Sequence, residues 1–558
     1  MSTAERPRDA ATHEVANQAP PYEAAGHNTF SGDRVLVEAL RREGGDWAEE
    51  RAVEIGAFAG SVQALRWGAE ANENPPKLRT HDRVGNRIDE VEFHPAWHEL
   101  LGAAVGFGLH ALPWREPQPG AHVARGAMFV AFSQAEAGVG CPISMTYSGI
   151  PALRRQPEVA AEWEPRLTSL EYDGRVLRPA PDKAGALCGM GMTEKQGGSD
   201  VRANTTVATS LNGGGAGAEY ELTGHKWFMS APMCDAFLVL AQAEGGLSCF
   251  LMPRFTPDGE RNRIQIQRLK DKLGNRSNAS SEVEFAGTWA RMVGEEGRGV
   301  PTIIEMVNHT RLDCTLGAAS GMRAGVANAI HHTAGRAAFG KLLIDQPLMR
   351  NVLADLAVES EAATVSAIRL ARAYDEAAAG DEQAQQLKRI ANAVLKYWLC
   401  KRAPSHAAEA LECFGGNGYV EESGMPRLYR ESPLNSIWEG SGNVQCLDVL
   451  RAMVRGPEAV EAFLGEVDEG RGSDPRLDAA ADALRDELGE IEAIESRARR
   501  VVERMALVLQ GSLLVRHGDP AVADAFCATR LAGDWGHAFG TLPAGTDFGR
   551  IIERHRPA

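Results

Sequence analysis

The spacing of hydrophobic positions predicts a helical segment at the start of the chain. From about residue 30 to 180, apolar residues recur three or four positions apart, as in DRVLVEALRREGGDWAEERAVEIGAFAG. That spacing is typical of amphipathic helices, and breaks containing Pro at Glu73–Pro76 and Ala111–Gly120 separate them. We therefore predict a helical domain over residues 31–185. Residues 1–30, rich in Pro, Ala and polar side chains, are predicted to form a mobile arm.

The pattern changes near Ala186 and then alternates with a period of two up to about Phe285. The alternating runs lie between Gly, Asn and Pro-Asp-Gly turn signals; they are YELTGHKWFMS, AFLVLAQ, LSCFLMP, IQIQRL and SSEVEFAG. Alternation of this kind indicates strands with one buried face. The sequence predicts an antiparallel β-domain over residues 186–290, which is an ordinary domain size.

Helical periodicity returns for the rest of the chain. Three long amphipathic segments begin at PTIIEMVNHT, LMRNVLADLA and QAQQLKRIAN, and the first is predicted to continue to Phe339. Long helices with short connections favour an antiparallel bundle, here over residues 291–455. LDAAADALRDELGEIEAIESRARRVVERMALVLQGSLLV predicts a further helical domain over residues 456–558.

The composition is that of a multi-domain protein of the cytoplasm. A chain of 558 residues is too long for one hydrophobic core. No stretch is apolar enough for a membrane helix, and the N-terminus lacks the apolar centre of a signal peptide. The nine cysteines form no CxxC pair and no His cluster has metal-ligand spacing, so we expect no metal and buried thiols in a reducing compartment. The net charge of −16 argues against indiscriminate nucleic-acid binding.

Two stretches of the β-domain could hold a planar or phosphorylated ligand. In GMTEKQGGSD, the hydroxyls of Thr193 and Ser199 flank two glycines, so the loop could offer hydroxyls and backbone N–H groups to a ring edge. The same loop could equally be a simple turn. In GHKWFMS, Trp227 and Phe228 could stack on a planar cofactor or, as the better interpretation of one aromatic pair, fill the core of the domain.

Two later stretches combine glycines with charge. ALECFGGNGYVEESGMPRLYRE has a glycine cluster at a predicted helix end, which permits close approach of a ligand or another backbone. NSIWEGSGN places Glu439 between an aromatic residue and a Gly-Ser-Gly turn, just before a predicted helix whose N-terminus favours negative charge. Two interpretations of Glu439 stay open at this point. It is either a solvated turn residue or a catalytic base on a loop lean enough for a flat ligand.

These four stretches, in this order on an α–β–α chain, resemble the acyl-CoA dehydrogenase superfamily of flavoproteins. The first and third resemble the two signatures of that family, although Glu412 stands where many members carry Gln. WEGSGN resembles the family's Tyr-Glu-Gly-Thr loop, with Trp438 and Ser441 as departures. The resemblance spans residues 90–455. Further stretches, among them ENPPKLRTHD and KDKLGNRSNAS, narrow it to the flavoprotein branch linked to the bacterial response to DNA alkylation.

The resemblance implies an α+β fold of N-terminal helical domain, central antiparallel β-domain and C-terminal helical bundle, plus an extra helical C-terminal domain. It also implies FAD between the β-domain and the bundle. Glu439 would be the base that removes a proton α to a thioester carbonyl while hydride leaves the β-carbon for the flavin, and burial would raise its pKa. The residues implied to contact FAD are Met190, Gly191, Met192, Thr193, Gly197, Gly198, Ser199, Phe228, Met229, Ser230, Ile437, Trp438, Gly440, Ser441, Gly442 and Asn443. Arg336 and Gln346 would reach the FAD of a partner subunit, which implies a homo-oligomer, by family habit a tetramer.

Basic residues outside these stretches leave two questions open. Lys270, Lys272 and Arg276 could touch a phosphate or form a solvated basic loop. The resemblance also implies binding of double-stranded DNA through the C-terminal region. Residues 456–558 nevertheless hold 12 Arg, no Lys and 19 acidic residues, a net charge of −7, which is unfavourable for phosphate contacts.

Clustered arginines keep the DNA hypothesis open. They could form a positive groove in an oligomer, or a solvated helix face laced by i, i+4 pairs. The arginines concerned are Arg451, Arg455, Arg497, Arg499, Arg500 and Arg504.

The leading interpretation is therefore a FAD flavoprotein of the alkylation-response branch with weak acyl-CoA dehydrogenase activity. The first alternative is a dedicated metabolic dehydrogenase of short or branched acyl-CoA. The second is a DNA-binding protein with a structural flavin.

Overall fold

The computed structural model describes residues 17–490 and 492–557. Residues 1–16 of the predicted arm lie outside this part. Residues 17–30, predicted to belong to the same arm, are instead packed against the helical bundle. The side chain of Asn17 donates to the carbonyl of Ala337 and accepts from its N–H, both at 2.8 Å, and the carbonyl of Pro20 lies 2.8 Å from Nε2 of His331.

The N-terminal domain is helical, as predicted, except for one hairpin. Its helices are α1 (Arg34–Arg42), α2 (Glu49–Ala59), α3 (Val62–Glu73), α4 (Pro95–Gly106), α5 (Leu112–Arg115), α6 (Ala121–Phe132), α7 (Gly140–Leu153) and α8 (Pro157–Leu167). The antiparallel hairpin is β1 (Lys77–His81) and β2 (Arg87–Glu92), and we did not predict it. Its strands are short and carry many charged side chains, so their alternation is weak in the sequence.

The β-domain contains the strands that the alternating runs predicted. They are β3 (Cys188–Gly191), β4 (Val207–Ser210), β5 (Glu219–Ser230), β6 (Ala236–Ala243), β7 (Gly246–Pro253), β8 (Ile264–Leu269) and β9 (Ser280–Val293). The prediction of a purely antiparallel sheet is wrong, because β3 and β4 both pair with β6 in parallel. The pairings run β6–β4–β5–β9–β7 and return to β6, so the sheet closes on itself.

Three long helices form the bundle, as predicted. They are α9 (Gly299–Gly335), α10 (Pro347–Ala378) and α11 (Glu382–Glu412), followed by α12 (Met425–Glu431) and α13 (Gly442–Arg455). The prediction that the first helix reaches Phe339 is wrong. It ends at Gly335, and the hairpin β10 (Ala337–Ala338) and β11 (Lys341–Leu342) follows, turning at Phe339 and Gly340, which both have positive φ.

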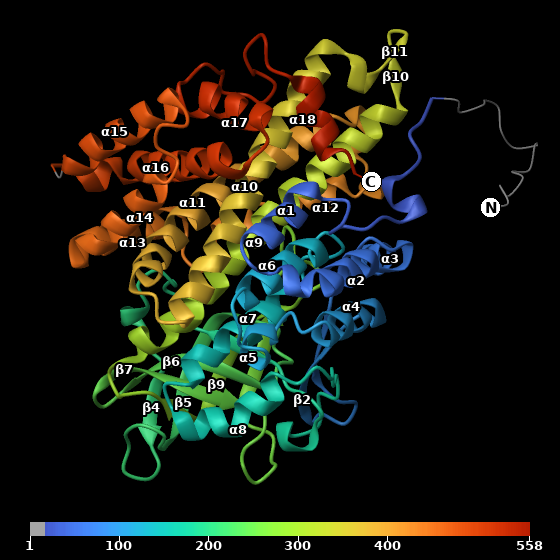
Figure 1. Cartoon of the computed structure of the whole chain (residues 1–558). Helices are drawn as coiled ribbons and strands as arrows, with labels where there is room; N and C mark the ends of the chain where they lie inside the picture. Colours follow the sequence, from blue (N-terminus) through green and yellow to red (C-terminus); the bar gives the residue numbers. More distant parts are fainter. Residues whose placement is uncertain (1–16, 491, 558) are drawn as a thin grey trace, which may run out of the picture.

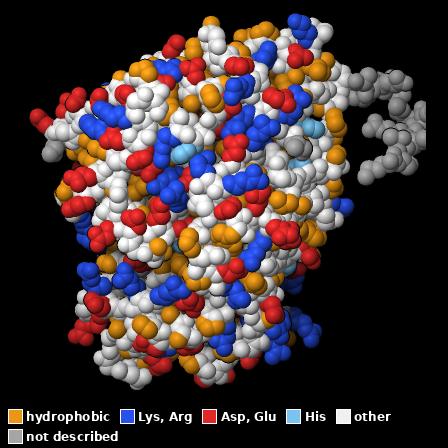
Figure 2. Space-filling view, in the orientation of Figure 1, with side chains coloured by type: hydrophobic (Ala, Val, Ile, Leu, Met, Phe, Trp, Pro, Cys, Tyr) orange, Lys and Arg blue, Asp and Glu red, His pale blue; other side chains and the backbone are white. Residues whose placement is uncertain are grey.

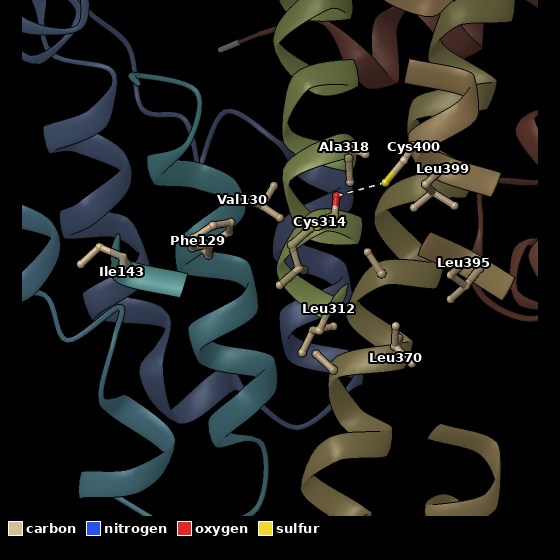
Figure 3. Close-up of a cluster of buried hydrophobic side chains, with 14 of the residues drawn as sticks. Phe129, Val130, Ile143, Leu312, Cys314, Ala318, Leu370, Leu395, Leu399 and Cys400 are labelled. Carbon is tan, nitrogen blue, oxygen red and sulfur yellow. Dashed lines mark hydrogen bonds between the residues drawn. The ribbon is translucent and has the colours of Figure 1, made fainter. Parts of the chain in front are cut away.

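The N-terminal domain and the bundle share one core. Figure 3 shows Phe129 and Val130 of α6 between Ile143 of α7 and Leu312 of α9, with residues of α10 and α11 completing the cluster. Cysteines take part as small apolar side chains, and the nine are free and buried, as predicted. No helix in the described part of the chain is long and apolar enough to cross a membrane.

The extra C-terminal domain is helical, as predicted. Its helices are α14 (Pro457–Asp468), α15 (Pro475–Gly489), α16 (Ile494–His517), α17 (Pro520–Phe526) and α18 (Phe548–His555). In Figure 1 this domain lies along the bundle, and α18 returns to α10 and α1 near the start of the chain. Arg530, fully buried, pairs with Asp355 and Glu359 of α10.

The carboxylate of Glu361 on α10 anchors the end of the chain. It accepts hydrogen bonds from Nε of Arg554 at 2.8 Å and from His555 at 2.9 Å, and it is fully buried. Burial alone would raise its pKa, but His555 and Arg554 lower the pKa of Glu361 to about 2. The charged carboxylate therefore stabilises the fold above the pKa of the unfolded chain, and this stabilisation is lost as the pH falls towards 2.

Replacing Glu361 with Gln should lower the free energy of unfolding by about 3–5 kcal/mol, because it leaves Arg554 and His555, which both hydrogen-bond to the buried carboxylate, without that partner. It should also flatten the acid dependence of stability between about pH 4.5 and 2. Denaturant unfolding across this pH range measures both effects. Glu38→Gln is the matched control: Glu38 also pairs with Arg554, but its side chain is 42% exposed, so a loss below about 1 kcal/mol is expected. Equal losses in the two variants would contradict the assignment.

Candidate active site

A buried ion pair positions the segment from Met190 to Ser199. Oε1 of Glu194 lies 2.8 Å from Nζ of Lys226 on β5, and both side chains are fully buried. Glu194 also accepts from the hydroxyls of Thr205 and Thr206, and Lys226 donates to the carbonyl of Leu240 at 2.7 Å. Burial lowers the pKa of Lys226 to about 8. The pair fixes β3 relative to β5, so the loop after β3 has a defined path.

The two sequence stretches of the β-domain meet along this path. The N–H of Trp227 donates to the carbonyl of Thr193 at 2.8 Å. Neither aromatic residue fills the core, so that interpretation is wrong. Trp227 is half-buried with the ammonium of Lys270 lying 3.6 Å from its ring centre, and Phe228 is 51% exposed. Phe228 therefore offers an apolar ring to a planar ligand.

The basic loop after β8 is not solvated as a whole. Lys270 pairs with Glu282 at 2.5 Å, and Lys272 donates to the carbonyl of Asn278 at 2.6 Å. Only Arg276 of the three basic residues is exposed. The interpretation as a solvated basic loop therefore fails for two of its three members, and the lysines serve internal contacts instead.

Glu439 is held in an uncommon backbone conformation by buried donors. Its φ is +58°, in the left-handed region that non-glycine residues rarely adopt. The ammonium of Lys396, on α11, donates to the carbonyls of Trp438 and Gly440 at 2.7 and 2.6 Å. Arg311 and Gln445 each donate to the carbonyl of Glu439 itself at 3.0 Å. Three consecutive carbonyls are thus fixed by side chains from three helices.

The carboxylate of Glu439 is half-buried and faces α9. The hydroxyl of Thr310 donates to its Oε2 at 2.7 Å. Burial raises the pKa of Glu439, while Thr310, Lys396 and Arg311 oppose that rise. The charge of Arg311 is largely met by Asp448, at 2.7 Å. The net result is a carboxylate with a raised pKa in a defined position, which suits a general base. A solvated turn residue does not fit these contacts.

Cys141, at the start of α7, is close enough to Ser230 at the end of β5 and to Glu439 for both to influence its thiol. Ser230 and Asn278 lie against its thiol, and Glu439 is within electrostatic reach of it. Burial raises the pKa of Cys141 to about 11, so the thiol stays protonated and uncharged. The structure therefore brings Glu439 towards the same region as Ser230, although the two residues are far apart in sequence.

The remaining predicted residues divide between two places. Met190 and Gly191 end β3, and Met229 and Ser230 end β5, while Gly197, Gly198 and Ser199 form the turn beyond Met192 and Thr193. Ile437, Ser441, Gly442 and Asn443 surround Glu439 at the start of α13. Arg336 and Gln346 lie beside the hairpin β10–β11, at the opposite end of the molecule from the β-domain in Figure 1. One chain therefore does not bring all these residues to a single ligand.

The residues near Ser230 fit the flavin that the resemblance implies. Phe228 and Ile437 expose 51% and 63% of their surface, although both are apolar. The amide of Asn278 is 1% exposed, and neither its oxygen nor its nitrogen has a hydrogen-bond partner among the described residues. A planar ring with polar edges would cover the apolar faces and could satisfy a buried amide.

Sequence reasoning missed the residues that hold the base. Thr310 and Arg311 stand out in no motif, since both act from α9, which is distant from Glu439 in sequence. Gln445 lies six residues after Glu439, just beyond the motif, and was not singled out. Lys396 carries a weak signal, because it is the single charge in the apolar run AVLKYWLC of α11. A lysine that interrupts a buried helix face usually has a specific partner.

The arginines considered for DNA fall into two groups. Arg497, Arg500 and Arg504 all lie near the carboxylate of Glu487, at 3.6, 3.4 and 2.5 Å. Arg451, Arg455 and Arg499 are exposed, and none has an acidic partner within 4 Å in the described ranges. Figure 2 shows basic and acidic side chains interspersed over the upper part of one face. The alternative of i, i+4 pairs is not what Arg497, Arg500 and Arg504 show: they share Glu487 of α15, and Arg497 also lies 3.4 Å from Glu490.

Comparisons with known proteins match most of the chain. Residues 17–174 match the adaptive response protein AidB N-terminal domain, residues 189–288 the acyl-CoA dehydrogenase middle domain, and residues 297–454 the acyl-CoA dehydrogenase C-terminal domain. The chain is 45% identical to a putative acyl-CoA dehydrogenase AidB of Escherichia coli strain K12, over 93% of this chain and 94% of that protein. It is 30% identical to acyl-CoA dehydrogenase family member 11 of Caenorhabditis elegans, over 89% and 85%. The solved structure of Caenorhabditis elegans ACDH-11 with C11-CoA has a TM-score of 0.84 at 27% identity, covering 93% of this chain and 94% of that one.

Replacing Lys396 with Met should keep the helix but release the carbonyls of Trp438 and Gly440. Glu439 would then leave its strained conformation, and a displacement of about 1 Å costs a catalytic group on the order of 10²-fold in rate. Stopped-flow measurement of flavin reduction, with bound flavin quantified in parallel, tests this. Lys388→Met, which removes a different lysine of α11 that is half-buried, should retain the wild-type rate. An undiminished rate in Lys396→Met would exclude the anchoring role.

Proposed function

Because this chain belongs to the acyl-CoA dehydrogenase family, as an AidB-like member, we propose that it oxidises the Cα–Cβ bond of an acyl-CoA with Glu439 as the base. Members of this family are FAD-dependent oxidoreductases that act on CH–CH bonds. The observation that carries the role of Glu439 is its half-buried carboxylate, held at positive φ by Lys396, Arg311 and Gln445. No other carboxylate of the predicted motifs combines a raised pKa with such fixation of its backbone.

In the proposed reaction, Glu439 takes the proton from the carbon α to the thioester carbonyl. The hydroxyl of Thr310 keeps one carboxylate oxygen in place, so the proton is taken by a group of fixed orientation. FAD, when bound, accepts the hydride that leaves the β-carbon. The product carries a Cα=Cβ double bond. Phe228 and the flanking loop cover the reacting atoms and exclude water.

The substrate class that we propose rests on the relatives rather than on the contacts of Glu439. The similar worm protein has been solved with C11-CoA, which supports an acyl-CoA thioester as the substrate class here.

The separation of Arg336 and Gln346 from the β-domain supports a homo-oligomer, in which these residues reach the FAD of a partner subunit. We propose a homotetramer acting in the cytoplasm, where the buried thiols stay reduced.

Glu439→Gln should bind FAD but lose about 10²–10⁴-fold in the rate of flavin reduction by acyl-CoA, because the amide cannot accept the α proton. Anaerobic titration with short, branched and long acyl-CoAs, followed by the absorbance of the oxidised flavin, measures this. In the unsubstituted protein the rate should rise with pH through an inflection above the ordinary carboxyl range, because the base must be deprotonated and its pKa is raised. Glu421→Gln, an exposed glutamate that pairs with Arg430, should behave as the unsubstituted protein.

The outcome also separates the alternatives. Rapid, complete bleaching by one class of acyl-CoA would favour a dedicated metabolic dehydrogenase. Its absence in the unsubstituted protein would favour a flavin with a structural role, and undiminished reduction in Glu439→Gln would remove Glu439 from the role of base.

A second proposed function is binding of double-stranded DNA in the response to DNA alkylation. It is supported by the match to an adaptive response protein over residues 17–174 and by the three exposed arginines without acidic partners, Arg451, Arg455 and Arg499. Each such cation is free to displace counterions from a phosphate. Arg497, Arg500 and Arg504 are less suited, because Glu487 already offsets their charge.

The triple variant Arg451→Ala, Arg455→Ala, Arg499→Ala should weaken DNA binding and reduce the slope of log K against log salt by about 2–3, at roughly 0.9 per phosphate contact. The matched control replaces Arg497, Arg500 and Arg504 and should change the slope less. Fluorescence anisotropy with a short duplex at several salt concentrations measures both. A larger loss in the control would show that Glu487 does not compete with phosphate, and no binding by the unsubstituted protein would end the proposal.

A further inference from the structure

A cavity of about 350 Å³ lies outside the candidate active site. It is bounded by the hairpin β1–β2, by α4, by the loop over residues 172–183 and by the loop that joins β5 to β6. Its volume falls within the range of small-molecule sites. None of the residues in the four sequence motifs lines it, so the proposed dehydrogenation does not account for it.

Part of the cavity wall is aromatic. Phe93 and Trp97 stack with ring centres 3.9 Å apart and an interplanar angle of 19°. Tyr172 lies opposite with its hydroxyl 2.7 Å from Nδ1 of His98, and burial keeps the pKa of His98 below its ordinary value, so this imidazole is neutral. Met233 and Pro142 complete the apolar surface. A planar ring fits such walls better than a branched or strongly hydrated molecule.

The cationic residues around the cavity are already matched by neighbours. Lys183 pairs with Asp235 at 2.7 Å, and both side chains are buried. At the rim, Arg79 pairs with Glu92. Glu90 has no ion-pair partner within 4 Å in the described ranges. An anionic ligand would therefore find no free counter-charge in the lining, so the ligand we expect is not an anion.

Two residues of the cavity lining nevertheless have hydrogen-bond donors without an acceptor among the described residues. Nε1 of Trp97 is buried without a hydrogen-bond partner in the described part of the chain, and the residue is only 4% exposed. Lys183 donates one of its three N–H groups to Asp235. An unmatched buried donor costs free energy until an acceptor arrives. The ligand that fits is flat, carries no negative charge and is supplied with carbonyl oxygens, which is the chemistry of a quinone.

Two residues that line the cavity are sequence neighbours of residues at the candidate flavin site. Ala231 lines the cavity and directly follows Ser230, and Pro142 lines it and directly follows Cys141. We propose that this cavity binds a quinone that reoxidises the reduced cofactor, an inference that rests on the proposed function. The quinone takes up two electrons and two protons and becomes a hydroquinone, while the cofactor returns to its oxidised form. Trp97 would hold one quinone carbonyl and Lys183 the other.

Binding is tested first, on the full-length holoprotein with oxidised flavin. The probe is 2,3-dimethyl-1,4-naphthoquinone, whose substituted ring does not add to the thiol of Cys234 in the cavity wall. Equilibrium dialysis should show one saturable site. Trp97→Phe keeps the ring but removes the donor, so the Kd should rise about 5- to 10-fold. Val176→Trp, a substitution in the lining loop, should fill the cavity and abolish binding.

Trp47→Phe is the matched control, because Trp47 lies on the surface with its indole N–H already donated to the carbonyl of Pro119. Its Kd should not change. Absence of saturable binding, or a Kd unchanged in both Trp97→Phe and Val176→Trp, would overturn the proposal.

Electron transfer is tested with photochemically reduced flavin, so that no acyl-CoA is needed. Under anaerobic conditions the quinone should reoxidise the flavin with saturation kinetics, and Val176→Trp should slow this at least 10-fold. Ferricyanide, which is charged, should reoxidise both proteins equally. Reoxidation by quinone that is unaffected by Val176→Trp would overturn the proposal. Quinone reoxidation without any reduction by acyl-CoA would instead refute the proposed dehydrogenation alone.

Discussion

One buried ammonium group determines the geometry of the candidate active site. Lys396 donates to the carbonyls on both sides of Glu439, and these contacts hold Glu439 at a φ that costs on the order of 1 kcal/mol or more. A lysine on α11 can do this only if α11 is fixed against α9 and α13. Arg311 and Gln445, from those two helices, complete the set of donors. The packing of the three helices therefore determines the position of the Glu439 carboxylate.

The same physical device recurs within the β-domain and at the end of the chain. Glu194 and Lys226 tie the loop after β3 to β5, and Glu361 ties the end of the chain to α10. A buried charge is strongly unfavourable without its partner, so each pair permits only one arrangement of the elements that carry it. These pairs add little net stability compared with apolar contacts of the same size. Their effect is to make the relative placement of the domains unique, which a site assembled from several helices requires.

Sequence patterns predicted elements well and their long-range contacts poorly. Alternation in YELTGHKWFMS and SSEVEFAG predicted β5 and β9, because each strand buries one face. It could not reveal that β3 and β4 pair in parallel with β6, since strand direction leaves no trace in a period of two. The motif around Glu439 suggested the base itself. Its holders remained hidden, because Thr310 and Lys396 approach it from helices more than 40 residues away in sequence. The prediction of FAD came from the family resemblance, because the spacing of hydrophobic residues carries no information about a cofactor.

The cavity beside the flavin site gives the N-terminal domain a role beyond packing. Its aromatic wall comes from Phe93 and Trp97, which lie within the segment matched by the AidB N-terminal domain, whereas the base and its holders lie in the bundle. The proposed acceptor site and the substrate site can change independently, because no residue of the four sequence motifs lines the cavity. Substitutions in the hairpin β1–β2 would then alter the acceptor while leaving the substrate site intact. This separation offers a physical reason why a chain with the dehydrogenase fold carries a distinct N-terminal domain.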